Sequence, residues 1–199
     1  ALSLSAADLA TFTPLVGITL PQLAGLEVAL SAQAIDGHTR LDKLDLTLDD
    51  PDVKAHITGS VNDIAEGDGI RLDADITTNQ GTALGKKLGT LNIESIPDSI
   101  TMNVSVAGNL EKLSITTIDI SLQDDGLDMN LSGTMENLLN LKGADAVLTG
   151  NMRNLDIISG YIGKELPPLG PFDLSAKVTS TENGTQLESL LLSLNDPTL

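Results

Sequence analysis

An alternating aliphatic pattern that returns three times is the feature that most constrains the fold of this 199-residue chain. Residues 41–50 read LDKLDLTLDD, residues 115–124 read ITTIDISLQD, and residues 187–196 read LESLLLSLND. The aliphatic positions of the three segments superimpose when they are shifted by 74 and then by 72 residues. Repetition at such a spacing is typical of folds that are assembled from copies of one supersecondary unit.

Two other markers recur with a similar spacing. A Leu or Ile followed by proline precedes each segment, at Pro21, Pro97 and Pro167, and Gly59 and Gly133 stand 74 residues apart. We therefore predict one repeat-built β domain with units of about 75 residues, the last of them truncated. The predicted units span residues 6–79, 80–153 and 154–199.

Within a unit the aliphatic residues alternate with polar or small ones, which predicts strands with one buried and one solvated face. Residues 26–32 alternate in this way, Asp36-Gly37 is a favoured hairpin dipeptide, and residues 49–52 are rich in turn formers. The predicted fold class is therefore mainly β, a curved antiparallel meander sheet of about ten strands.

Short connector helices are expected near residues 6–20, 80–91 and 155–166, and Ser5 with Asp8 resembles a helix-capping box. Ten strands at about 4.8 Å spacing make a sheet roughly 48 Å wide. Three short helices cannot cover so much apolar surface. The sheet is therefore expected to curve into a groove, or to bind an apolar ligand.

Composition excludes several classes of function. Acidic residues outnumber basic ones by 28 to 11, which gives a formal net charge of −17 and disfavours binding to nucleic acid. Hydrophobic residues make up 41 % of the chain but aromatic residues only 2 %, so the interior is expected to be aliphatic. The chain has no cysteine, which excludes disulfides and thiolate metal sites.

No group of residues in the sequence predicts catalysis or a cofactor. Residues 81–87 (GTALGKK) resemble a phosphate-binding loop but have one residue too few between the glycines, so we interpret them as a connector helix. His38 and His56 are expected on the surface without a metal or catalytic partner. We therefore expect a protein that is not an enzyme and that needs no cofactor.

A cluster of aspartates was weighed as a metal site. It lacks the spaced ligands and the terminal Glu of a calcium-binding helix–loop–helix loop, so a solvated strand face followed by a turn is the preferred interpretation. The cluster consists of Asp42, Asp45, Asp49, Asp50 and Asp52.

Both ends of the sequence indicate a fragment of a larger protein. The chain begins inside a helix-like pattern and stops at residues 195–197, which predict a turn. For a single aliphatic residue such as Leu46, ordinary sheet packing is the simpler interpretation. Taken together, however, the aliphatic rows suit acyl chains, which require continuous apolar contact and no directional hydrogen bonds.

Residues 166–178 (LPPLGPFDLSAKV), which follow a helix-like segment, resemble the AsmA-like family of Gram-negative envelope proteins. In that family a short helix, a turn of this type and amphipathic strands recur. Residues 20–25 (LPQLAG) and 96–99 (IPDS) are degenerate versions of the same turn. Through its repeats the resemblance covers nearly the whole chain, although the central copy lacks the Leu-Gly-Pro.

The resemblance implies a periplasmic β-groove that carries phospholipids between membranes in outer-membrane biogenesis. The groove would belong to a protein anchored in the inner membrane by a segment outside this chain. The expected partners are then phospholipid acyl chains and other segments of the same protein. The residues predicted to contact lipid are Val28, Leu46, Ile57, Leu72, Val104, Ile120, Leu131, Leu148, Leu174 and Leu192.

An alternative from another class stays open at this point. A repetitive adhesin or cell-surface scaffold would bury the same aliphatic residues in a dry core and would bind no ligand through them. An open apolar concavity favours lipid binding, whereas two sheets closed against each other favour the scaffold.

Overall fold

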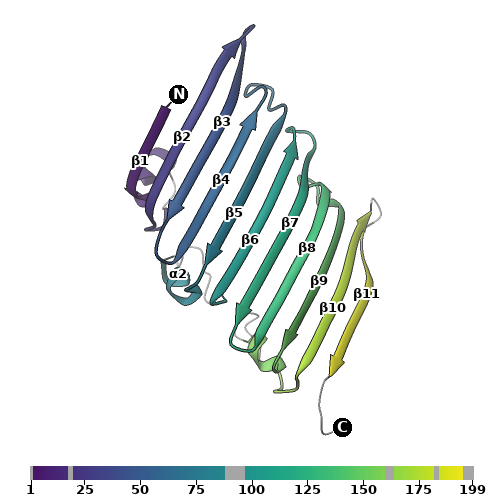
Figure 1. The fold of residues 1–199 in the computed structure, drawn as a ribbon. Coiled ribbons are helices and arrows are strands. Elements are labelled where there is room, and N and C mark those ends of the chain that lie inside the picture. Colours follow the sequence, from purple (N-terminus) through teal and green to yellow (C-terminus); the bar gives the residue numbers. More distant parts are fainter. Residues whose placement is uncertain (1, 18–19, 88–96, 160–163, 182–183, 195–199) are drawn as a thin grey trace.

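The computed structural model describes residues 2–17, 20–87, 97–159, 164–181 and 184–194. They form one antiparallel sheet of eleven strands, in which each strand pairs with its neighbours in the sequence (Figure 1). The sheet is not closed, because its order begins at β1 and ends at β11. The predicted fold class, a mainly β antiparallel meander, is confirmed.

Most strands are long, between nine and twelve residues. The strands are β1 (Leu2–Asp8), β2 (Ala24–Ile35), β3 (His38–Asp49), β4 (Val53–Val61), β5 (Ile70–Thr78), β6 (Ser99–Gly108), β7 (Leu113–Asp124), β8 (Leu127–Asn137), β9 (Lys142–Met152), β10 (Phe172–Thr181) and β11 (Gly184–Leu194). The helical segments are η1 (Leu9–Phe12), α1 (Thr13–Val16), α2 (Gly81–Lys87) and η3 (Leu155–Ile158).

The strand register gathers the aliphatic residues on one face. Leu4 pairs with Val28, Val28 with Leu46, and Leu46 with Ile57. The same row continues through Ala74, Val104, Ile118, Gly133, Ala146, Val178 and Leu187. Because successive side chains of a strand point to opposite faces, the polar residues between these positions lie on the other face.

Three strands carry a β-bulge at matching positions. One extra residue interrupts the pairing of β3 with β2 at Asp42, of β7 with β6 at Thr116, and of β11 with β10 at Glu188. These bulges are separated by 74 and 72 residues, the spacing of the sequence pattern. Bulges increase the local twist of a sheet and thereby favour curvature. The division of the chain into three units stays a prediction that this spacing supports.

The expected helix at residues 6–20 is wrong in its first part. Residues 2–8 form β1, which pairs along β2, so the sheet has eleven strands rather than ten. Pairing overrides local preference here, because Leu2, Leu4 and Ala6 alternate and extend the apolar face of β2. Asp8 accepts a hydrogen bond from Ala10 N at 2.8 Å and caps η1, so the proposed capping box with Ser5 does not form.

The other two connector helices are shorter than expected. In the second connector α2 occupies Gly81–Lys87, which confirms a helix in place of a phosphate loop, and residues 88–91 lie outside the described residues. In the third connector Leu155–Ile158 form a single 3-10 turn. Residues 160–163 lie outside the described part, and residues 164–166 are not helical.

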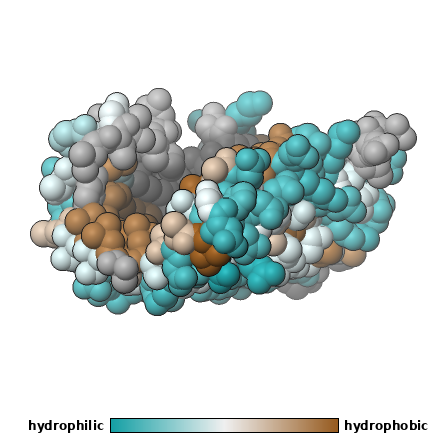
Figure 2. Space-filling model, turned by 90° about the horizontal axis from the view of Figure 1, so that it is seen from above, coloured by the Kyte–Doolittle hydropathy of each residue, from teal (hydrophilic) through white to brown (hydrophobic). Residues whose placement is uncertain are grey.

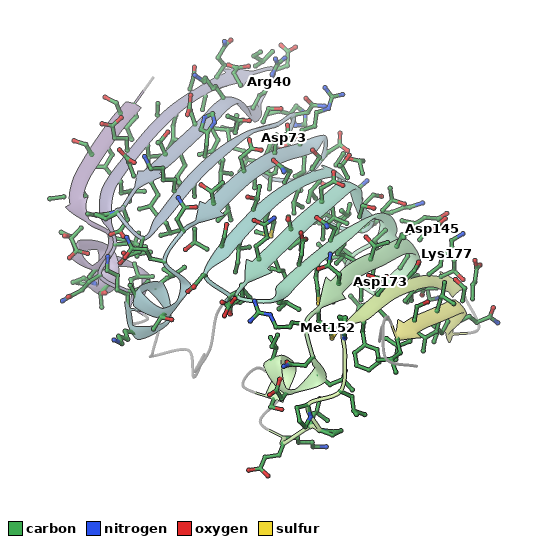
Figure 3. All side chains as sticks on the ribbon, turned by 60° about the horizontal axis from the view of Figure 1, so that its bottom comes forward. Arg40, Asp73, Asp145, Met152, Asp173 and Lys177 are labelled. Carbon is green, nitrogen blue, oxygen red and sulfur yellow. The ribbon has the colours of Figure 1, made fainter. Side chains whose placement is uncertain are left out.

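Two buried clusters lie at the lower ends of the strands in Figure 1, where the helical segments cover the apolar face. Leu84 of α2 packs with Leu26, Leu48 and Val53. The second cluster contains Leu127, Met152 and Phe172, with Leu155 and Ile157 packed against it. Met152 lies next to the η3 segment in Figure 3.

Over the residues that the structure describes, every helix is too short or too polar to cross a lipid bilayer.

Candidate functional site

All ten residues predicted to contact lipid lie on the apolar face of the sheet. Val28, Leu46, Ile57 and Val104 belong to one cross-strand row. A neighbouring row contains Ile120, Leu131 and Leu148, and the last three predicted residues, Leu72, Leu174 and Leu192, lie on the same face in rows beyond these two. The structure thus brings the ten residues onto one surface, and their contact with lipid stays a prediction.

The apolar face is only partly covered. The buried residues of the face are concentrated at the lower ends of the strands, beneath α2 and η3, whereas Val28, Leu46 and Ile57 in mid-strand are half-buried. Figure 2 shows hydrophobic residues within a hollow of the molecule and mostly hydrophilic residues on its outer side. The face is therefore a trough that one sheet forms by curving, with the helical segments along one rim.

The chemistry of this face is aliphatic, with few side chains that can hydrogen-bond. Thr78 interrupts the row that contains Ile100 and Leu122, but it is only 3 % exposed and its hydroxyl donates to Asp52 O at 2.6 Å. Its hydrogen-bonding capacity is thus directed at the backbone and away from the trough. Such a surface can bind alkyl groups along its whole length but cannot orient a polar headgroup.

The opposite face is polar and carries ion pairs. His56 Nε2 lies 3.1 Å from Asp45 Oδ1, and Lys43 Nζ lies 2.8 Å from Asp45 Oδ2. The hydrogen bonds from Lys43 and then His56 hold the pKa of Asp45 below its usual value. A cavity of about 410 Å³ on this face is lined by Glu27, Asp45 and Thr47, among others.

Both histidines have acidic partners, which corrects the expectation that they stand alone. His56 contacts Asp45 across β3 and β4, and His38 contacts Asp63 in the loop after β4. Both imidazoles are exposed, and each pair lies within the polar surface. Similar pairing occurs further along, where Lys177 Nζ lies 3.6 Å from Asp145 Oδ1, and Figure 3 shows these residues on adjacent strands.

The aspartate cluster divides in a way that the sequence did not indicate. Asp50 was expected in a solvated turn but is 2 % exposed. It accepts hydrogen bonds from Ala24 N at 2.8 Å, from Asp52 N at 2.9 Å and from Lys87 Nζ at 2.7 Å. Burial raises the pKa of Asp50, but these hydrogen bonds outweigh it, and the pKa stays below its usual value.

The partner that completes this buried group comes from α2. Lys87 Nζ also lies 2.7 Å from Asp52 Oδ2, so one ammonium bridges two carboxylates. The contact fastens α2, and with it Leu84, against the lower end of the trough. Among the residues that the structure describes, no three His, Cys, Asp or Glu side chains are grouped so that they could hold a metal ion.

Comparison of this chain with protein-family models, with curated proteins and with solved structures finds no match. The fold and the trough therefore define the class of protein by themselves: an open, curved meander sheet with one continuous aliphatic face.

Proposed function

We propose that the aliphatic trough accommodates phospholipid acyl chains, and that the chain is a non-catalytic groove segment of a periplasmic lipid-transport protein. The observation that carries this proposal is the unbroken aliphatic row from Leu4 to Leu187 across all eleven strands. The resemblance of residues 166–178 to AsmA-like envelope proteins supports the same function.

The dimensions and exposure of the trough suit alkyl chains. Eleven strands at about 4.8 Å spacing extend roughly 48 Å along the pairing direction. Each CH₂ group that leaves water for such a surface contributes about 0.8 kcal/mol. A partly covered chain therefore gains enough to offset its lost freedom, while its headgroup stays in water at the rim.

The absence of strong polar anchors on the apolar face agrees with movement along it. A carrier must bind chains well enough to extract them and weakly enough to let them slide, and aliphatic contact meets both conditions because it is non-directional. Membrane attachment and the route to the outer membrane would be supplied by parts of the larger protein outside residues 1–199.

Photo-crosslinking in bacterial membranes tests the proposal. A photo-reactive amino acid at Leu46 or Ile120, which face the trough, should label phospholipid in the complete protein. The same group at Asp45 or Asp119 faces the polar side and serves as a matched control, one residue away in each strand. Equal labelling at all four positions, or none in membranes with active transport, would favour a ligand-free scaffold instead.

A further inference from the structure

We propose that the outer edge of β11 is an acceptor for one antiparallel strand of the β4 and β8 type, supplied by a separate polypeptide segment. Within the described residues β11 has a single partner strand, β10. The proposal does not depend on lipid binding, because it rests on the backbone register of the sheet.

The bulge in β11 is the first observation. In β3 and β7 the bulge at Asp42 and Thr116 shifts the register toward the preceding strand and also toward the following one. In β11 the bulge at Glu188 is already formed against β10. The backbone of β11 therefore has the shape that β3 and β7 use to pair on both sides.

The strands that follow these bulges supply the second observation. The segments Val53–Val61 (VKAHITGSV) and Leu127–Met135 (LDMNLSGTM) have aliphatic residues at positions one, three, five and nine. They pair with β3 and β7 in the same register: position five lies opposite Leu46 or Ile120, and position nine opposite Leu41 or Ile115. Two independent examples therefore define the strand that fits.

Transferring this register to β11 places each residue of the acceptor. Position three of the incoming strand lies opposite Leu194, position five opposite Leu192, position seven opposite Leu190, and position nine opposite Leu187. On the polar face position four lies opposite Ser193, as Asn130 lies opposite Ser121 in β7 and β8.

Exposure of the edge is the third observation. Leu190, Leu192 and Leu194 are 60 %, 50 % and 45 % exposed, whereas the matching residues Ile118, Ile120 and Leu122 of β7 are only half-exposed at most, because β8 covers them. Leu191 adds an aliphatic side chain, 63 % exposed, to the polar face of the same edge. A long apolar edge with unsatisfied backbone groups is a template for strand addition.

A second copy of the chain is a poorer occupant. With eleven antiparallel strands β1 and β11 run in the same direction (Figure 1). A copy joined head to tail, with its apolar face on the same side, would place its β1 parallel to β11 and abandon the antiparallel register that the bulge prepares. One strand of the β4 and β8 type restores that register.

Directed disulfide formation tests the proposal, because the chain has no cysteine and Ser193→Cys supplies a single thiol. The probe is a synthetic peptide of sequence LDMNLSGTM that carries one cysteine at position two, four or six. Opposed residues of antiparallel strands lie within disulfide reach, whereas a shift of two residues does not. We expect the position-four peptide to crosslink about tenfold faster than the other two under mild oxidation.

A peptide of the same composition in scrambled order, with cysteine at position four, controls for collision. Equal crosslinking of the scrambled peptide, or equal rates at all three positions, overturns the proposal. Disulfide-linked dimers of the Ser193→Cys protein that form in preference to peptide adducts also overturn it, because they show a second copy at this edge.

Discussion

Lys87 Nζ lies 2.7 Å from Asp50 Oδ1, and this contact joins the first hairpin of the sheet to a helix 37 residues further along the chain. Asp50 is almost fully buried, so the pair is shielded from solvent at the carboxylate end. A buried carboxylate that loses a charged partner remains in a medium where it is poorly solvated. The position of α2 over the trough therefore depends on this contact.

Replacing Lys87 by Met keeps the aliphatic stem but removes the ammonium that bridges Asp50 and Asp52. We expect a loss of about 2 kcal/mol in the free energy of unfolding, because the two N–H donors to Asp50 remain and limit the cost. Urea unfolding followed by circular dichroism measures it. Lys86→Met, at the exposed neighbouring position, is the matched control and should change stability little. Equal effects of the two substitutions would contradict the role assigned to Lys87.

The acid limb of stability should depend on Asp50. Hydrogen bonds hold the folded-state pKa of Asp50 below its ordinary value of 3.8, despite the opposing effect of burial. A depressed folded pKa stabilises the fold above the unfolded pKa, and this contribution is lost as the pH falls through the folded value. Thermal melts should therefore show stability declining below about pH 4, with a shallower decline in Asp50→Asn. The same slope in both proteins would show that other carboxylates govern the acid limb.

Which parts of this fold are legible in the sequence follows from the range of the interactions. Alternation along Leu44, Leu46 and Leu48 reports a face directly, because it reflects neighbours on one strand. By contrast, the burial of Asp50 depends on Lys87, which only the folded position of α2 brings near. The strand at residues 2–8 was missed for a related reason: it is short, and its pairing with β2 decides its conformation.

Ile120 and Asp119 are neighbours on β7 that face opposite sides of the sheet. Ile120→Asp should destabilise the protein by about 2–4 kcal/mol, because it places a carboxylate among aliphatic side chains of β6 and β8. Asp119→Asn keeps a polar side chain on the solvated face and should change stability little. Thermal melts of the two variants check the face assignment, and equal tolerance at both positions would refute it.

Gly59 lies where β4 and β5 approach closely. A Cβ at this position would stand 2.8 Å from Arg71 O, so the backbone of β5 would have to move. We expect Gly59→Val to cost about 1–3 kcal/mol through this overlap, despite the higher strand propensity of valine. Thr58→Val, on the opposite face of β4, offers a control of similar chemistry. Greater stability of Gly59→Val in urea unfolding would show that β5 yields without cost.

The affinity of the trough for phospholipid should follow acyl-chain length more than headgroup identity. Each CH₂ that is fully buried raises affinity by up to about fourfold, since it contributes about 0.8 kcal/mol. Headgroups that differ in charge should change affinity by less than about threefold at moderate salt, because they stay in water at the rim. Competition against a photo-reactive fatty-acyl probe, with the label read at Leu46, measures both series. A strong headgroup preference with no dependence on chain length would place the binding site on the polar face and exclude the trough.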